Sequence, residues 1–209
     1  MSTSSLDRSQ LPLNGILVLD FSQFLAGPVS AMRLADLGAR VIKIERPGTG
    51  DIGRTLAFAG LEKDGDTLSF HIMNRNKESF AADLKNSDSL KEVWELVKKA
   101  DVIIQNFRPG VIERLGFGYD DVKGMNEKLI YAQIKGFPQD GPFANLLAFD
   151  PVAQAAGGGV SITGEKDQRP VKPGMNVGDT GAGLHCLIGI LAALYQREQT
   201  GKGQKIDVS

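Results

Sequence analysis

Short apolar runs that alternate with helical stripes constrain the fold of this chain more than any other feature of its sequence. Ile16 to Asp20 (ILVLD) and Ala39 to Glu45 (ARVIKIE) have the length and apolar character of buried strands. Between them, residues 27–37 have apolar residues at helical spacing, and this pattern ends at Gly38. A strand, a helix and a second strand in this order predict a βαβ unit with parallel strands.

The same alternation continues along the chain. The pattern predicts further strands at 79–84, 101–105 and 129–134, the start of another at 204–209, and helical segments at 87–100, 111–115 and 120–125. Ser87 or Asp88 is the expected cap of the first of these helices. The sequence therefore predicts an α/β fold with a doubly wound, mostly parallel sheet and flanking helices. Ligands of such sheets bind at the carboxyl ends of the strands.

Charge, cysteine and histidine content exclude several classes of function. The chain has 24 Lys and Arg against 25 Asp and Glu, so no overall field favours nucleic acid or an anionic membrane. Cys186 is the only cysteine, which excludes an intramolecular disulfide and a multi-cysteine metal cluster. His71 and His185 lie far apart in the sequence, without the spacing of metal ligands. We therefore expect no metal site and no nucleic-acid partner.

Neither a leader nor a membrane anchor is expected. The opening residues MSTSSLDRSQLPL lack the apolar core of a signal peptide. The longest apolar stretch, LHCLIGILAALY at 184–195, is shorter than a bilayer-spanning segment. These features predict a cytoplasmic protein.

The turn after the first strand offers one candidate for nucleotide binding. FSQFLAGP at 21–28 could hold a phosphate on its backbone amides where the next helix starts. Glu45 ends the second strand, where dinucleotide-binding folds keep a ribose acceptor. A dinucleotide-binding oxidoreductase or binding module is thus one hypothesis, although the chain has no G-x-G-x-x-G fingerprint.

Basic residues gather on segments expected at one edge of the sheet. These are Arg40, Lys43, Arg46, Arg75, Lys77, Arg108 and Arg114. Each alone is typical of a solvated surface. Together, on loops at one end of the strands, they suggest a polyphosphate site.

Asp179 in GMNVGDTGAG allows two interpretations. Aspartate is a preferred helix N-cap, and a clear apolar stripe begins at Leu184, so capping is the first. The second is catalytic, because a helix N-terminus favours an ionised carboxylate. Gly178, Gly181 and Gly183 would let a substrate approach closely, or would offer amides to a developing oxyanion.

Several motifs in combination resemble the class III CoA-transferase family, also called the CaiB/BaiF family. They are LDFSQFLAGPVSAMRLADLGARVIKIERPGTGD, NRNK, QNFRPGVIERLGFGYDD, IKGFPQDGP and NVGDTGAG, and the resemblance runs from Leu13 to Ser209. It implies a Rossmann-like large domain, a smaller second domain and an interlocked homodimer. On this basis residues 1–209 are expected to form a truncated large domain, without the small domain and the returning C-terminal segment.

The resemblance also implies residue roles. Asp179 matches the family nucleophile, which carries acyl and CoA groups between an acyl-CoA and a carboxylic acid acceptor, with no permanently bound cofactor. The CoA contacts carried over by motif are Gln23, Leu25, Ala26, Lys43, Arg46, Asn106, Phe107, Arg114, Lys135 and Gly136.

Within the same family, a 2-methylacyl-CoA racemase is the nearest alternative. It removes and returns an α-proton, which requires two opposed acid/base groups. Racemases of the family have a histidine just before an aspartate in the segment that matches LAFDPVAQAAGG, where this chain has Phe149 before Asp150. The missing histidine favours CoA transfer.

Overall fold

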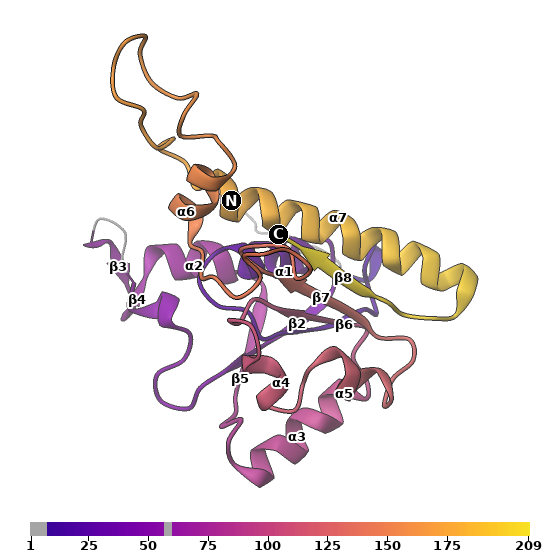
Figure 1. Cartoon of the computed structure of the whole chain (residues 1–209). Coiled ribbons are helices and arrows are strands. Elements are labelled where there is room, and N and C mark those ends of the chain that lie inside the picture. Colours follow the sequence, from indigo (N-terminus) through magenta and orange to yellow (C-terminus); the bar gives the residue numbers. More distant parts are fainter. Residues whose placement is uncertain (1–7, 57–59) are drawn as a thin grey trace.

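Six parallel strands form the central sheet of the computed structural model, which describes residues 8–56 and 60–209 (Figure 1). In sheet order the strands are β5 (Lys77–Ala81), β2 (Arg40–Glu45), β1 (Leu17–Asp20), β6 (Val102–Gln105), β7 (Ile130–Ile134) and β8 (Lys205–Val208). All five pairings in this sheet are parallel, which confirms the predicted fold class. Chain order reverses between β1 and β6, and ligands bind at such a switch point in open α/β sheets.

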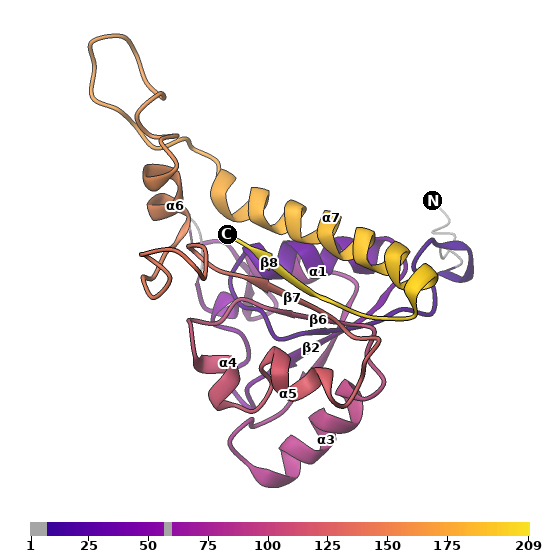
Figure 2. The same cartoon turned by 45° about the vertical axis from the view of Figure 1, so that its right-hand side comes forward.

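Helices cover both faces of the sheet (Figures 1 and 2). One face carries α1 (Ala26–Asp36) and α7 (Val177–Thr200), and the other carries α3 (Ser87–Val97), α4 (Val111–Arg114) and α5 (Tyr119–Lys123). Strand residues alternate between the two cores: Val18 packs toward α1 and α7, whereas Leu19 packs toward α3. Both faces of the central strands are therefore buried, which explains why they are continuous apolar runs.

The remaining elements lie around these layers. They are η1 (Arg8–Gln10), η2 (Ile52–Arg54), the antiparallel pair β3 (Glu62–Lys63) and β4 (Asp66–Thr67), α2 (Leu68–Asn74) and α6 (Asp150–Ala156). The sequence pattern predicted none of them. Residues 1–7, which belong to the opening segment in which no signal peptide is expected, lie outside the described residues.

The predicted cap of α3 is wrong by one residue. Asn86 is the N-cap, and its side-chain oxygen accepts hydrogen bonds from the amides of Asp88 (2.9 Å) and Ser89 (3.2 Å). Ser87 and Asp88 are instead the first two residues of the helix. Several consecutive residues here are good caps, so composition alone does not select one.

The apolar stretch after Asp179 belongs to a longer helix than expected. With 24 residues, α7 is about 36 Å long, and it is the one helix in the described residues with the length and hydropathy to cross a membrane. The prediction that this segment is too short is therefore wrong. One side of α7 packs against α1, β7 and β8 through residues that include Cys186 and Ile190.

Glu45, at the end of β2, is held by several donors. Its carboxylate accepts from Arg54 at 2.9 and 2.8 Å, from the Asp51 amide at 2.9 Å and from the Ser79 hydroxyl at 2.5 Å. Burial alone would raise the pKa of Glu45, but these bonds lower it from 4.5 to about 2.

The free energy of unfolding is expected to decrease as the pH is lowered, because protonation of the Glu45 carboxylate removes its contribution. The native state binds fewer protons at Glu45 than the unfolded chain between pH 4.5 and pH 2, so its contribution is complete above pH 4.5 and disappears toward pH 2. It amounts to about 3 kcal/mol, since one pKa unit is worth about 1.4 kcal/mol. Urea unfolding of the protein and of Glu45→Gln from pH 6 to pH 3 should show two curves that converge as the pH falls. Parallel curves would contradict the assignment.

Candidate active site

Two adjoining cavities lie at the carboxyl ends of the strands, beside the switch point between β1 and β6. One has a volume of about 200 Å³ and the other about 720 Å³. Phe24, Asn106, Phe107 and Arg108 line both of them. The loops after β1 and β6 thus form the wall between the two cavities.

The smaller cavity contains Asp179. The predicted site residues that line it are Leu25, Ala26, Asn106, Phe107, Lys135, Gly136, Gly178 and Asp179. Most of its other lining residues are apolar, among them Leu146 and Phe149. Phe149 also packs edge-on against Phe24, with ring centroids 5.4 Å apart. The carboxylate of Asp179 therefore faces an apolar space formed by segments that are distant in the sequence.

The larger cavity is more polar. Gln23, Lys43, Arg46, Asn106 and Phe107 are the predicted residues that line it. Arg108 and Lys85 line it as well, and neither was among the predicted CoA contacts. Arg108 was nevertheless among the basic residues predicted to form a polyphosphate site, because it lies in the loop after a predicted strand. Lys85 was missed, although it directly follows the strand predicted at 79–84.

Three predicted site residues line neither cavity. Arg114 is exposed on α4, with its guanidinium over Gly110. Gly183 is buried where α7 crosses α1, and a Cβ atom there would lie 2.6 Å from the carbonyl oxygen of Ala26. Gly181 has open space around it. Their roles in CoA binding or catalysis remain predictions, although Gly183 has an evident packing reason to be glycine.

The turn between β1 and α1 is fixed by side chains from other loops. Asn106 accepts from the Gln23 amide (2.8 Å) and donates to the Gln23 carbonyl (2.7 Å). Phe24 has φ 65°, the left-handed conformation that few side chains adopt. The turn is therefore held in a specific shape rather than left free.

Below this turn, Lys43 is buried, and its amine contacts several oxygen atoms. Its amine donates to the Ser22 carbonyl at 2.7 Å, lies 2.7 Å from the Asp51 carboxylate and is 3.9 Å from Asp20. Lys43 thus supports the wall of the larger cavity from beneath. Lys135 is similarly occupied, because its amine donates to the Phe107 carbonyl at 2.6 Å, and burial lowers its pKa.

Asp179 does not cap the helix. Val177 begins α7 and Asn176 is the N-cap position, so Asp179 lies in the first turn. The amides of Gly178 (2.9 Å) and Asp179 (3.2 Å) donate instead to the carboxylate of Asp150 on α6. The capping interpretation is therefore wrong: the cap comes from another element. Asp179 accepts no hydrogen bond from any residue that the structure describes.

The environment of Asp179 makes its carboxylate more basic than usual. Burial in the apolar cavity raises its pKa, and the negative charge of Asp150 raises it further, from 3.8 to about 6. It remains mostly ionised at neutral pH. An accessible carboxylate of raised basicity, without hydrogen-bond partners, is suited to act as a nucleophile or a base.

Glu45 is not available as a ribose acceptor. Both of its oxygens are occupied by Arg54, Asp51 and Ser79. The prediction that Glu45 ends a strand is confirmed, but its hydrogen bonds to residues outside that strand determine its role. This removes the main residue-level support for a dinucleotide-binding module. Within residues 8–56 and 60–209, no group of three or more His, Cys, Asp or Glu side chains could hold a metal ion.

Comparison with known sequences agrees with this geometry. The sequence model of CoA-transferase family III matches residues 13–209. A formyl-CoA:oxalate CoA-transferase of Afipia carboxidovorans is 44% identical over 200 residues, which are 94% of this chain and 46% of that protein. A protein of the same name from Escherichia coli O139:H28 is 42% identical over 95% of this chain and 47% of its own length. The chain spans about half the length of the curated relatives it matches.

Solved structures show the same fold. A CaiB/BaiF family protein from Brucella suis superposes with a TM-score of 0.90 at 40% identity, over 95% of this chain and 53% of that one. A hypothetical protein from Mycobacterium tuberculosis gives a TM-score of 0.86 at 34% identity, over 95% and 54% of the two chains. Since the family match, the fold and the strand-end cavities all agree, the chain belongs to CoA-transferase family III.

Proposed function

We propose that the protein to which this chain belongs transfers CoA from an acyl-CoA thioester to a free carboxylic acid, with Asp179 as the nucleophile. The observation that carries the proposal is the position of Asp179 in a largely apolar cavity next to a larger, charged one, whose lining includes Arg46, Lys85 and Arg108. CoA has a matching division: its thioester end is small and weakly polar, whereas its nucleotide end carries phosphates.

In the proposed reaction, a carboxylate oxygen of Asp179 attacks the thioester carbonyl. The C–S bond breaks, and the products are an acyl-aspartyl anhydride and CoA thiolate. The thiolate attacks the aspartyl carbonyl, which releases the first acid as its carboxylate and leaves an aspartyl-CoA thioester. The acceptor carboxylate then repeats these steps in reverse order, so that Asp179 is regenerated and the new acyl-CoA leaves.

The cavity around Asp179 supports this chemistry in two ways. Its apolar lining limits the access of water, which would hydrolyse the anhydride or the thioester. Burial also raises the basicity of the carboxylate while leaving it mostly ionised at pH 7, which favours nucleophilic attack. The amides of Gly178 and Asp179 are engaged by Asp150, so donors for a developing oxyanion would come from elsewhere.

We assign the nucleotide end of CoA to the larger cavity. Arg46, Lys85 and Arg108 would pair with its phosphates, since guanidinium and ammonium groups bind phosphate through charge-assisted hydrogen bonds. Phe107, which lines both cavities, would pack on the pantetheine arm between them. We further propose that the chain forms the large domain of a homodimeric enzyme.

An acyl-CoA-dependent trapping experiment tests the reaction. Hydroxylamine added with an acyl-CoA to the full-length protein should inactivate it, release CoA and leave a hydroxamate on Asp179 that mass spectrometry identifies. Neither reagent alone should inactivate. Formyl-CoA with oxalate is the first pair to assay, because the relatives at 42–44% identity carry that name. Succinyl-CoA and acetyl-CoA with a panel of acids should follow.

A 2-methylacyl-CoA racemase is the alternative function, and the residues that line the Asp179 cavity argue against it. Proton exchange needs two opposed acid/base groups, yet Phe149 lines the cavity where family racemases have histidine. Incubation of a 2-methylacyl-CoA in deuterated water should therefore leave its α-carbon unlabelled. Deuterium at that carbon, without hydroxamate at Asp179, would overturn the transfer proposal.

A further inference from the structure

Asp150 joins the start of α7 to α6 through its buried carboxylate. One oxygen accepts from the amides of Gly178 (2.9 Å) and Asp179 (3.2 Å). The other accepts from the side-chain amide of Gln154 at 2.6 Å and lies 3.5 Å from the Lys172 ammonium. Only 3% of Asp150 is exposed. A carboxylate with this many donors has a single well-defined position.

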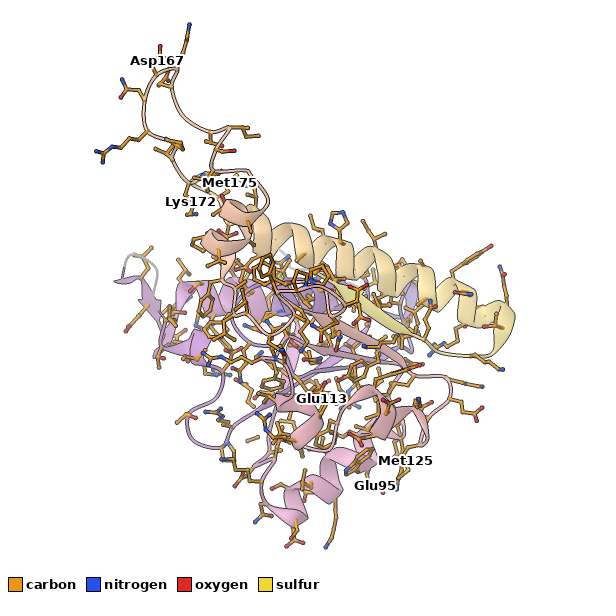
Figure 3. The ribbon with its side chains drawn as sticks, in the orientation of Figure 1. Glu95, Glu113, Met125, Asp167, Lys172 and Met175 are labelled. Atoms are coloured by element: carbon orange, nitrogen blue, oxygen red, sulfur yellow. The ribbon has the colours of Figure 1, made fainter. Side chains whose placement is uncertain are left out.

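The same cluster closes the base of a long arm. Residues 157–176 leave α6, project away from the body of the protein and return at α7 (Figures 1 and 2). Asp167 lies near the tip, whereas Lys172 and Met175 lie toward the base (Figure 3). Gln154 donates to the Met175 carbonyl at 3.0 Å as well as to Asp150. The part of the arm that returns to α7 is thereby linked, through Gln154, to Asp150, which caps α7.

Close packing makes this junction sensitive to small changes. A Cβ atom at Gly178 would lie 3.1 Å from the Asp150 carboxylate and 3.2 Å from Ala153. The glycine therefore lets α6 come close enough for Asp150 to reach the helix amides. Because the first turn of α7 carries Asp179, any shift of Asp150 would move the carboxylate of Asp179 within its cavity.

We infer that Asp150 is a positioning residue for Asp179: it fixes the backbone that carries the nucleophile and keeps a second negative charge beside it. The inference rests on the proposed function. It deepens that function, because it explains why the reactive carboxylate does not cap its own helix. With both local amides bound to Asp150, the Asp179 oxygens are left without a backbone partner and face the substrate.

Several charged side chains lie near Asp179, and Asp150 differs from the others in its contact with the Asp179 backbone. From α6 there is Asp150, with Lys172 of the arm beside it. From the sheet side, Arg108 and Lys135 line the same cavity. The amine of Lys135 is bound to the Phe107 carbonyl. Only Asp150 contacts the backbone of Asp179 among these groups in the described residues.

Two substitutions in the full-length protein separate the two effects. Asp150→Asn keeps an oxygen to accept the amides but removes the charge. It should lower the midpoint of Asp179 titration by about one pH unit and leave most of kcat intact at pH 7. Asp150→Ala removes the acceptor too. It should lower kcat by about 100-fold with less than a threefold change in KM for the acyl-CoA, because misplacement of a reacting group has effects of this size. Asp167→Asn, the same change near the arm tip, should alter neither quantity.

The titration should be measured without relying on turnover. A water-soluble carbodiimide modifies protonated carboxyl groups, so its rate at Asp179, followed by mass spectrometry across pH, gives the midpoint directly. An unchanged midpoint in Asp150→Asn, or equal losses of kcat in both variants, would overturn the inference. A wild-type protein whose Asp179 never carries CoA would instead overturn the proposed function, while the carbodiimide titration would still decide the role of Asp150.

Discussion

Replacement of Asp179 by alanine in the full-length protein is expected to abolish CoA transfer and to leave CoA binding intact. The variant has no side-chain oxygen to form the anhydride, and loss of a nucleophile costs at least about 10³-fold in kcat. The larger cavity, to which we assign the CoA phosphates, does not include Asp179. Transfer assays and calorimetric titration with CoA measure the two properties separately.

The structure also predicts that Asp179→Ala folds normally. Asp150 supplies the acceptor for the amides at the start of α7, so removal of the Asp179 carboxylate breaks no cap. Urea denaturation should give a midpoint equal to or above that of the wild type, since a half-buried carboxylate that accepts no hydrogen bond from the described residues is removed. Asp167→Asn serves as the exposed control, because Asp167 has φ 64° and asparagine tolerates this left-handed conformation better than alanine. A variant that loses its fold would revive the capping interpretation, and one that keeps full activity would exclude Asp179 as nucleophile.

Asp20→Asn is expected to destabilise the protein more than any surface substitution. Asp20 is fully buried at the end of β1, with the Lys77 amine at 2.8 Å and the Lys43 amine at 3.9 Å. Burial alone would raise the pKa of Asp20, but the two ammonium groups hold it below its usual value. Burial lowers the pKa of Lys77, whereas the negative charge of Asp20 opposes this change. The positive charge of Lys77 therefore depends on Asp20.

Neutralising Asp20 leaves two buried ammonium groups with one nearby carboxylate, Asp51. Breaking a buried ion pair in this way costs about 3–5 kcal/mol, a large fraction of the stability of a typical domain. Urea denaturation measures the loss. Asp88→Asn is the matched control, because Asp88 forms an exposed ion pair with Lys91 at 3.0 Å, and its loss should not be measurable. Similar denaturation midpoints for the two variants would contradict the structural role of the buried network.

The location of the site follows from this network together with the sheet. Asp20 also accepts from the amide and the hydroxyl of Ser22, and Lys43 donates to the Ser22 carbonyl. The turn that lines both cavities is thus anchored in the buried charges below it. Such a rigid turn is a suitable wall for a ligand, because its geometry does not have to form on binding.

Local pattern was enough to predict the parallel sheet and the edge at which its loops gather. Apolar runs of five to seven residues, separated by segments with helical periodicity, placed β1, β2, β6 and β7 within about one residue of their observed bounds. This works because side-chain period and burial are properties of neighbouring residues. The carboxyl ends of parallel strands must then meet at one edge, so loops distant in sequence could be brought together without a structure.

Only the tertiary structure decided which partner each polar group has. Asp179 lost its role as a cap because Asp150, from another helix, reaches its amide, and Glu45 lost its role as a ribose acceptor because Arg54 holds it. Lys43, which was predicted to contact CoA, is buried and forms an ion pair with Asp51 beneath the larger cavity. These outcomes depend on distances of a few ångströms between segments that are far apart in the chain. The sequence of either segment alone does not encode them, since hydrogen bonds and charge pairs form with whichever group packing brings within reach.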